Sequence, residues 1–207
     1  MIAAQTDYLY PPRPGGSIMP GDLGYYEKSG VWLIQPKFNE SRILTHVLPS
    51  GEVVFWTRHR TRPTPARFDA PTLANEVKAL RLTPGVEYWI DGGVMNREKE
   101  AGGELVFFDV LCLGQYLFLK LTQEDRLVAL SKICGEPTES NVDGTALRVS
   151  ERLWMAPCFQ DGFHDRLKSL VEFNYIEGVM LRKRESVIDN YGRKQYEASW
   201  MKRCRVK

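Results

Sequence analysis

Short apolar runs separated by turn residues dominate the first third of the chain. Residues 31–34 form one such run, and Pro36 is expected to end it, because proline disfavours helix at the residue before it. Two further runs, 42–48 and 52–57, flank a Pro-Ser-Gly turn and predict a hairpin. Lys37 is therefore expected on a loop that leads from a strand into this hairpin.

Helical spacing and runs rich in β-branched or aromatic residues predict the remaining elements. Apolar residues at helical intervals behind Asp69, a capping candidate, predict a helix over 71–82. A second helix should begin at Thr122 and stop at Gly135. The other expected elements are strands over 88–95 and 105–113, a helix over 161–173, and strands near 178–181 and 200–206. Hairpins rather than strict strand–helix alternation indicate an α+β fold with a largely antiparallel sheet.

Composition supports one folded domain over residues 25–207, preceded by an extended lead-in over 1–24. The 207 residues are 43% hydrophobic, enough for a sizeable core, whereas the lead-in is rich in proline and glycine and should be loosely held. No membrane span or signal peptide is recognisable, so we expect a soluble, intracellular (cytoplasmic) monomer that binds no membrane. Four widely spaced cysteines suggest reduced, structural thiols.

Basic residues are unevenly distributed although the net charge is only +2. Between residues 182 and 207, nine basic residues stand against three acidic ones, an excess of six. A second basic group has no acidic residue within it and comprises Arg58, Arg60, Arg62 and Arg67. The two groups either flank a common nucleic-acid site or form two solvated faces, and charge alone does not decide between them.

Five short motifs follow one another in an order that suggests a specific chemistry. They are KFNESR (37–42), IDGGVM (90–95), FFDVL (107–111), EGVMLRK (177–183) and WMKRCR (200–205), with Arg58 after the first. This series resembles the ordered motifs of ATP-dependent DNA ligases and of the wider covalent nucleotidyltransferases, which include RNA ligases and capping enzymes. The resemblance implies a ligase-type nucleotidyltransferase (adenylation) domain, in which ATP binds between two mainly antiparallel sheets flanked by helices.

The resemblance also implies a role for each matching residue. Lys37 matches the nucleophile that attacks the α-phosphate of ATP, releases pyrophosphate and holds AMP as a phosphoramidate. A lysine attacks only when it is unprotonated, so its pKa must fall through desolvation or through nearby cations such as Arg42, Lys202 and a bound metal ion. Taken alone, Lys37 would be an ordinary loop lysine, and only the accompanying motifs favour the catalytic role.

Other matching positions imply contacts with nucleotide, metal and nucleic acid. Arg42 and Arg58 match arginines near the nucleotide and the 5′-phosphate end, and Glu177 matches a ligand of catalytic Mg²⁺ or Mn²⁺. The expected nucleotide-binding positions are Gln35, Lys37, Arg42, Arg58, Asp91, Phe108, Glu177, Arg182 and Lys202. The expected nucleic-acid-binding positions are Arg58, Arg60, Arg62, Arg203 and Arg205. Of two adjacent phenylalanines, only the family register selects Phe108 rather than Phe107 as the face beside adenine.

Three departures from the family motifs alter the expected chemistry. Asn39 and Glu40 stand where aspartate and glycine are usual, and Gly93 stands where a glutamate would contact the ribose. Asp91 lies on the same strand face as Gly93 and is the candidate replacement. Cys204 occupies a position where a second lysine is usual.

The favoured interpretation is an ATP- and Mg²⁺-dependent DNA ligase that seals a 5′-phosphate to a 3′-hydroxyl in nicked or broken DNA, as in repair or replication. No C-terminal OB-type domain is expected after residue 207. RNA joining, an enzyme that stops at self-adenylation, and a non-catalytic module that binds nucleotide or strand ends are the alternatives.

Overall fold

The strands of the computed structural model form two principal sheets and one short parallel pair among the described residues, which are 8–64, 68–96, 103–114, 116–117, 121–135, 139–140, 145–188 and 195–206. The larger sheet runs β4-β3-β5-β6-β10-β9-β8, with β7 also paired to β6. Its strands are β3 (Glu40–Val47), β4 (Val53–Thr57), β5 (Tyr88–Met95), β6 (Leu105–Leu113), β7 (Tyr116–Leu117), β8 (Glu139–Ser140), β9 (Leu147–Arg148) and β10 (Leu153–Met155).

The smaller sheet and the short pair contain the remaining strands. The smaller sheet runs β13-β11-β2 and consists of β2 (Trp32–Phe38), β11 (Ile176–Lys183) and β13 (Met201–Arg205). The parallel pair joins β1 (Arg13–Pro14) to β12 (Glu197–Ala198). All other pairings except β6 with β10 are antiparallel among the described strands. The expected α+β class with mainly antiparallel sheets is therefore confirmed.

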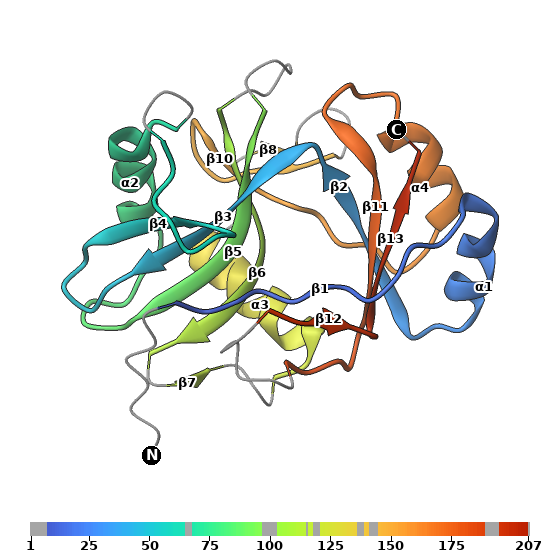
Figure 1. Cartoon of the computed structure of the whole chain (residues 1–207), viewed down its shortest axis with the longest axis horizontal. Helices are drawn as coiled ribbons and strands as arrows, with labels where there is room; N and C mark the ends of the chain where they lie inside the picture. Colours follow the sequence, from blue (N-terminus) through green and yellow to red (C-terminus); the bar gives the residue numbers. More distant parts are fainter. Residues whose placement is uncertain are drawn as a thin grey trace.

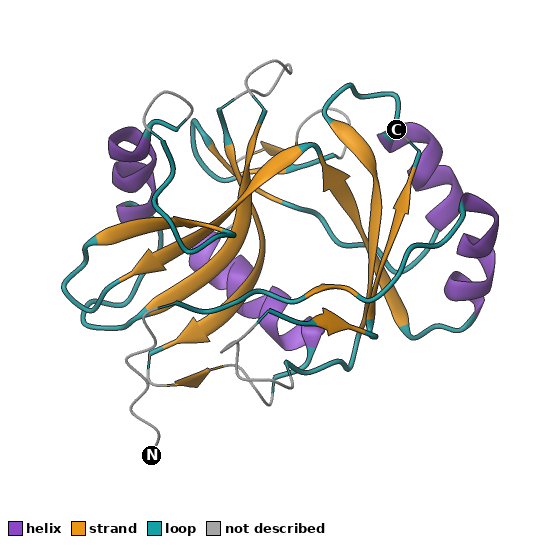
Figure 2. Cartoon of the chain, viewed as in Figure 1, coloured by secondary structure: helices purple, strands orange, loops and turns teal. Residues whose placement is uncertain are grey.

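Helices lie at the left and right edges of the view in Figure 2, and one more lies behind the strands in the middle. They are η1 (Pro20–Asp22), α1 (Leu23–Lys28), α2 (Ala70–Lys78), α3 (Gln123–Cys134) and α4 (Phe163–Leu170). Helix α3 packs against β6 of the larger sheet, whereas α1 and α4 pack together beside the smaller sheet (Figure 1). One apolar cluster centres on the larger sheet with α2 and α3, and a second joins the smaller sheet to α4.

Several elements match their predicted bounds because local sequence signals fix them. Strands β5 and β6 have the predicted limits, and the hairpin of β3 and β4 forms around the Pro-Ser-Gly turn. Helix α3 begins after Thr122, whose side chain and that of Asp125 form a reciprocal capping box, and it ends at Gly135 with a φ of 79°. Helices α2 and α4 are shorter than the predicted 71–82 and 161–173.

Lys37 lies on a strand, so the predicted loop position was wrong. Strand β2 continues through Pro36, which is paired with Val179 of β11, and ends at Phe38. Strand β2 is an edge of the smaller sheet, where the missing N–H of a proline interrupts no ladder. The pairing with β11 therefore overrides the local stop signal and places Lys37 opposite Gly178.

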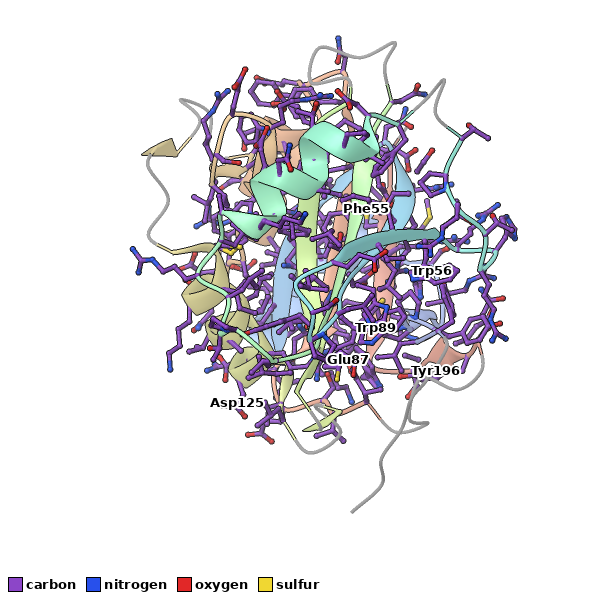
Figure 3. All side chains as sticks on the ribbon, turned by 90° about the vertical axis from the view of Figure 1, so that its left-hand side faces the viewer. Phe55, Trp56, Glu87, Trp89, Asp125 and Tyr196 are labelled. Carbon is purple, nitrogen blue, oxygen red and sulfur yellow. The ribbon has the colours of Figure 1, made fainter. Side chains whose placement is uncertain are left out.

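The N-terminal segment is not loosely held from residue 8 onward, contrary to the expectation for the lead-in. Tyr8 and Leu9 are buried beside strands of the larger sheet, with Tyr8 between Trp56 and Trp89. Figure 3 shows those two tryptophans on the same side of the molecule. Farther on, the N–H of Gly15 donates to carbonyl oxygens of Ala198 and Met201. The segment thus spans both sheets (Figure 1).

Candidate functional site

Lys37 and Glu177 form an ion pair between neighbouring strands of the smaller sheet. The Nζ of Lys37 donates to Oε2 of Glu177 at 2.7 Å, and both side chains are largely buried, with 14% and 21% exposed. Arg205 of β13 approaches the same carboxylate oxygen at 3.0 Å. Three motifs that lie far apart in the sequence therefore meet at one carboxylate.

Gly178 explains why β13 comes so close to this pair. A Cβ built on Gly178 would lie 3.0 Å from the Cα of Arg205 and closer still to the carbonyl oxygen of Cys204. Its φ of 153° and the bulge between Ile176 and Gly178 also favour glycine. The glycine after Glu177 is thus required by packing, and it lets Arg205 contact the carboxylate.

Arg42 and Asp91 form a bidentate ion pair between β3 and β5. The Nε of Arg42 donates to Oδ1 of Asp91 at 2.8 Å, its Nη2 pairs with Oδ2, and its Nη1 donates to the Pro12 carbonyl at 3.2 Å. Burial opposes the charge of this guanidinium, but the adjacent Asp91 carboxylate raises the pKa of Arg42 overall. Both carboxylate oxygens of Asp91 thus pair with Arg42, and the replacement of a carboxylate at position 93 by Asp91 stays a prediction.

Glu40 covers the space in which a side chain at position 93 would stand. A Cβ built on Gly93 would lie 2.9 Å from the Cβ and 3.4 Å from the Cδ of Glu40, with the Cγ closer still. Burial raises the pKa of Glu40 to about 7, and Lys37 and Arg42 only partly offset that effect. Two of the motif departures are thus in direct contact.

Arg182, one of the expected nucleotide-binding positions, belongs to a buried ionic cluster. Its Nη1 donates to Oδ2 of Asp109 at 2.9 Å, and Arg126 binds the same carboxylate through Nε at 3.0 Å. Gln123 completes the cluster. Burial lowers the pKa of Arg182 although Asp109 favours its charge. Asp109 and Arg126 were not identified from the sequence as members of a site. The available signal was the aspartate in the apolar FFDVL motif, because a charged residue in a buried strand needs a partner.

The two phenylalanines of β6 face opposite ways, as alternation along a strand requires. Phe107 is fully buried in the core of the larger sheet, whereas Phe108 is partly exposed and stacks on Phe38 with ring centroids 6.0 Å apart. The Nε2 of Gln35 donates to the Phe108 carbonyl at 3.4 Å. The geometry agrees with the choice of Phe108 as the accessible ring.

Lys202 lies on β13 beside the N-terminal segment. A Cβ built on Gly16 would lie 3.3 Å from the Nζ of Lys202, so the segment passes directly over this ammonium group. Strand pairing sets Lys202 opposite Leu181 of β11. The side chain is partly buried, and among the described residues no ion pair involves it.

The arginines expected to bind nucleic acid form two groups, one after a strand of the larger sheet and one on a strand of the smaller sheet. Arg58, Arg60 and Arg62 follow β4 of the larger sheet, while Arg203 and Arg205 belong to β13 of the smaller one (Figure 1). The guanidinium of Arg62 lies 4.0 Å from the centroid of the Trp56 ring. Arg203 donates to Ser17 at 2.9 Å. Arg67 and the basic residues at 193, 194 and 207 lie outside the described part of the chain.

No described group of three or more His, Cys, Asp or Glu residues is arranged to hold a metal ion. Mg²⁺ commonly binds proteins through only one or two carboxylates, with water and phosphate oxygens as its other ligands. Glu177, beside Lys37, fits that limited requirement. The four cysteines are free thiols, and in the described ranges no helix has the length and hydrophobicity needed to cross a membrane.

The two sheets and their flanking helices have a ligase-type nucleotidyltransferase fold. The structure is similar, over 97% of the chain, to the ligase domain of LigD from M. tuberculosis, with a TM-score of 0.64 and 15% identity. It is also similar, over 98% of the chain, to mycobacterial DNA ligase D complexed with ATP and MES, with a TM-score of 0.66 and 15% identity. A third similar structure, Pmar-Lig_PreS3, matches 96% of the chain and 47% of its own length, with a TM-score of 0.59 and 16% identity.

The chain spans 60% and 62% of the lengths of the two ligase D structures. No family model matches the sequence. No curated protein matches it either.

Proposed function

We propose that this chain is the nucleotidyltransferase unit of an ATP-dependent DNA ligase and that Lys37 holds AMP covalently. The observation that carries the proposal is the 2.7 Å contact between the Lys37 amine and Glu177, formed within a fold shared with a DNA ligase solved with ATP. The carboxylate orients the amine, and attack on phosphorus requires that Lys37 first give up the proton that this ion pair stabilises.

The reaction would proceed in three transfers. The Lys37 nitrogen bonds to the α-phosphorus as the bond to pyrophosphate breaks, which leaves AMP on the lysine. An oxygen of a 5′-phosphate then bonds to the phosphorus of AMP as the bond to the Lys37 nitrogen breaks. A 3′-hydroxyl loses its proton, attacks the phosphorus of that 5′-phosphate and displaces AMP. Arg42 and Lys202 would offset the negative charge that develops on the phosphates. Asp91, bound to Arg42 through two contacts, would hold that guanidinium in position.

Glu177 would hold Mg²⁺ or Mn²⁺, with phosphate oxygens of the nucleotide as further ligands. When bound, the ion would shield negative charge on the triphosphate. Phe108 would offer its accessible ring to adenine, beside the buried Gln35. Arg182 would act indirectly, because Asp109 holds it in the buried cluster.

The DNA-binding part of the proposal concerns the exposed arginines. Arg58, Arg60 and Arg62 on one sheet and Arg203 and Arg205 on the other would contact phosphates of nicked or broken DNA, as in repair or replication. Contacts of this type make binding strongly dependent on salt. We further propose that the protein acts as a monomer inside the cell.

Intact-mass spectrometry after incubation with ATP and Mg²⁺ tests the central step. Wild type should gain the mass of one AMP, and Lys37→Ala should not. Lys78→Ala is the matched control, since Lys78 is exposed on α2 and should leave the gain unchanged. Absence of any gain with either metal would contradict covalent transfer and leave a reversible nucleotide- or strand-end-binding module.

The choice of polynucleotide needs a separate assay. A nicked duplex with a labelled 5′-phosphate, made wholly of DNA or with RNA at the nick, should be sealed best as DNA. Preferential sealing of the RNA substrate would reassign the chain to RNA joining. Tagging of Lys37 without sealing of either substrate would limit its activity to self-adenylation.

A further inference from the structure

Glu40 and Gly93 share one space between strands β3 and β5. The built Cβ at Gly93 would lie 2.9 Å from the Cβ of Glu40, so position 93 can carry no side chain while Glu40 keeps its present conformation. Arg42, two residues beyond Glu40 on the same strand face, is paired directly opposite Gly93. The space beside Gly93 is therefore filled by the Glu40 side chain of β3, while the Asp91 carboxylate of β5 is bound to Arg42.

No other residue in the described part of the chain donates a hydrogen bond to the Glu40 carboxylate. Lys37 and Arg42 act on it electrostatically, but the described hydrogen bonds and ion pairs of these cations go to Glu177 and to Asp91. The backbone N–H of Glu40 lowers the pKa of its own carboxyl, but less than burial raises it. Burial raises the pKa of Glu40 to about 7, which reflects the poor solvation of its charged form. A partly buried carboxylate in this state gains from a donor supplied by a ligand.

We infer that Glu40 is a specificity-determining residue that accepts a hydrogen bond from a sugar hydroxyl of the nucleotide bound at Lys37. The inference rests on the proposed function and deepens it. Lys37 would bond to the α-phosphorus, and the sugar is the part of the nucleotide attached directly to that phosphate. Glu40 is three residues from Lys37 and interacts with it electrostatically. Phosphate oxygens carry negative charge and no donor, so a carboxylate repels them, whereas a sugar hydroxyl can donate.

The contact predicts selection for ribonucleotides. A hydrogen bond to a charged group discriminates by on the order of tenfold or more. In the Lys37→Ala background, where no covalent product forms, calorimetry should show ATP binding about tenfold or more tighter than 2′-deoxy-ATP or 3′-deoxy-ATP. Glu40→Ala should abolish that preference, and Glu40→Gln should reduce it. Glu52→Ala is the control, because Glu52 is exposed at the far end of the same hairpin.

Exchanging the two residues provides the sharper test. Gly93→Glu alone should fail to fold or should lose the preference, because its side chain would collide with that of Glu40. The double variant Glu40→Gly with Gly93→Glu relieves the collision and should regain a folded state and the ribose preference. Thermal midpoints recorded for every variant distinguish a folding defect from a binding defect.

An unchanged ratio of ATP to deoxynucleotide affinity in a folded Glu40→Ala variant would overturn the inference. The inference would also be overturned if the double variant lost as much stability and ribose preference as the two single substitutions lose in sum. In another combination of results, wild type gains no AMP while Glu40→Ala still loses the ribose preference. That combination would contradict covalent transfer but would leave the role of Glu40 intact. Loss of AMP transfer and loss of ribose selection are thus distinguishable results.

Discussion

Asp109 on β6 and Arg182 on β11 form an ion pair of 2.9 Å that links the two principal sheets. Arg126 of α3 binds the same carboxylate, and all three side chains are almost completely buried. One negative group therefore compensates two buried guanidinium groups. The cluster fixes the smaller sheet, which contains Lys37 and Glu177, relative to the larger sheet, which contains Arg42 and Phe108.

Asp109→Asn should lower the free energy of unfolding by about 3–5 kcal/mol, because it removes the carboxylate that pairs with two buried guanidinium groups. Urea denaturation of the variant and of wild type measures this difference. Asp165→Asn is the matched control: its ion pair with Lys168 is almost fully exposed and should contribute less than about 1 kcal/mol. Equal effects of the two substitutions would contradict the structural importance of the cluster.

Gly178→Ala should destabilise the protein by roughly 2 kcal/mol or more, because the new Cβ would collide with the Cys204 carbonyl. It should also slow AMP transfer by moving Arg205 away from Glu177. Gly24→Ala serves as the comparison, since no atom lies within 4 Å of a Cβ built at this position in α1. Denaturant midpoints and adenylation rates measured together would show whether packing at Gly178 affects both properties; wild-type stability in Gly178→Ala would argue against it.

Glu40 should make stability fall as the pH rises from about 4.5 to about 7. The pKa of Glu40 is raised to about 7 in the folded protein from its ordinary value of 4.5, so in this range the folded state binds more protons than the unfolded state. The protonated group's stabilising contribution is complete below the unfolded pKa and is lost as the pH approaches 7. Glu40→Gln removes this titration. The free energy of unfolding of the variant minus that of wild type should therefore increase from pH 4.5 to pH 7. If the difference in unfolding free energy between Glu40→Gln and wild type stays constant from pH 4.5 to 7, the pKa of Glu40 is not raised in the folded protein.

DNA binding should lose part of its salt dependence when Arg58 and Arg62 are both replaced by alanine. Each lost phosphate contact should reduce the slope of log affinity against log salt by about 1. Fluorescence anisotropy with nicked duplex at several salt concentrations measures the slope. Lys168→Ala, on the exposed face of α4, should leave it unchanged. If the arginine and lysine variants give the same slope, the arginine group after β4 is not part of the DNA interface.

Local sequence signals were sufficient for several elements. Strands β5 and β6 and helix α3 have the predicted limits, because alternation, β-branched residues, a Thr122 cap and a Gly135 stop act over only a few residues. The choice of Phe108 over Phe107 also agrees with strand alternation. The order of motifs in the sequence was enough to predict the ligase-type fold that the structural comparisons confirm.

Tertiary pairing decided what those signals could not. Pro36 stops a strand in isolation, yet pairing with β11 carries β2 past it and sets Lys37 on a strand. The burial of Tyr8 and Leu9 likewise depends on surfaces from distant strands.

The sequence by itself determined the limits of β5, β6 and α3, the α+β class and the set of residues that resemble a nucleotidyltransferase site. Only the tertiary structure decided their partners: Asp91 with Arg42, Asp109 with Arg182, and Glu40 over Gly93. The physical reason is range. Propensity and capping act between near neighbours, whereas desolvation, ion pairing and steric exclusion depend on which distant residues the folded sheets bring into contact.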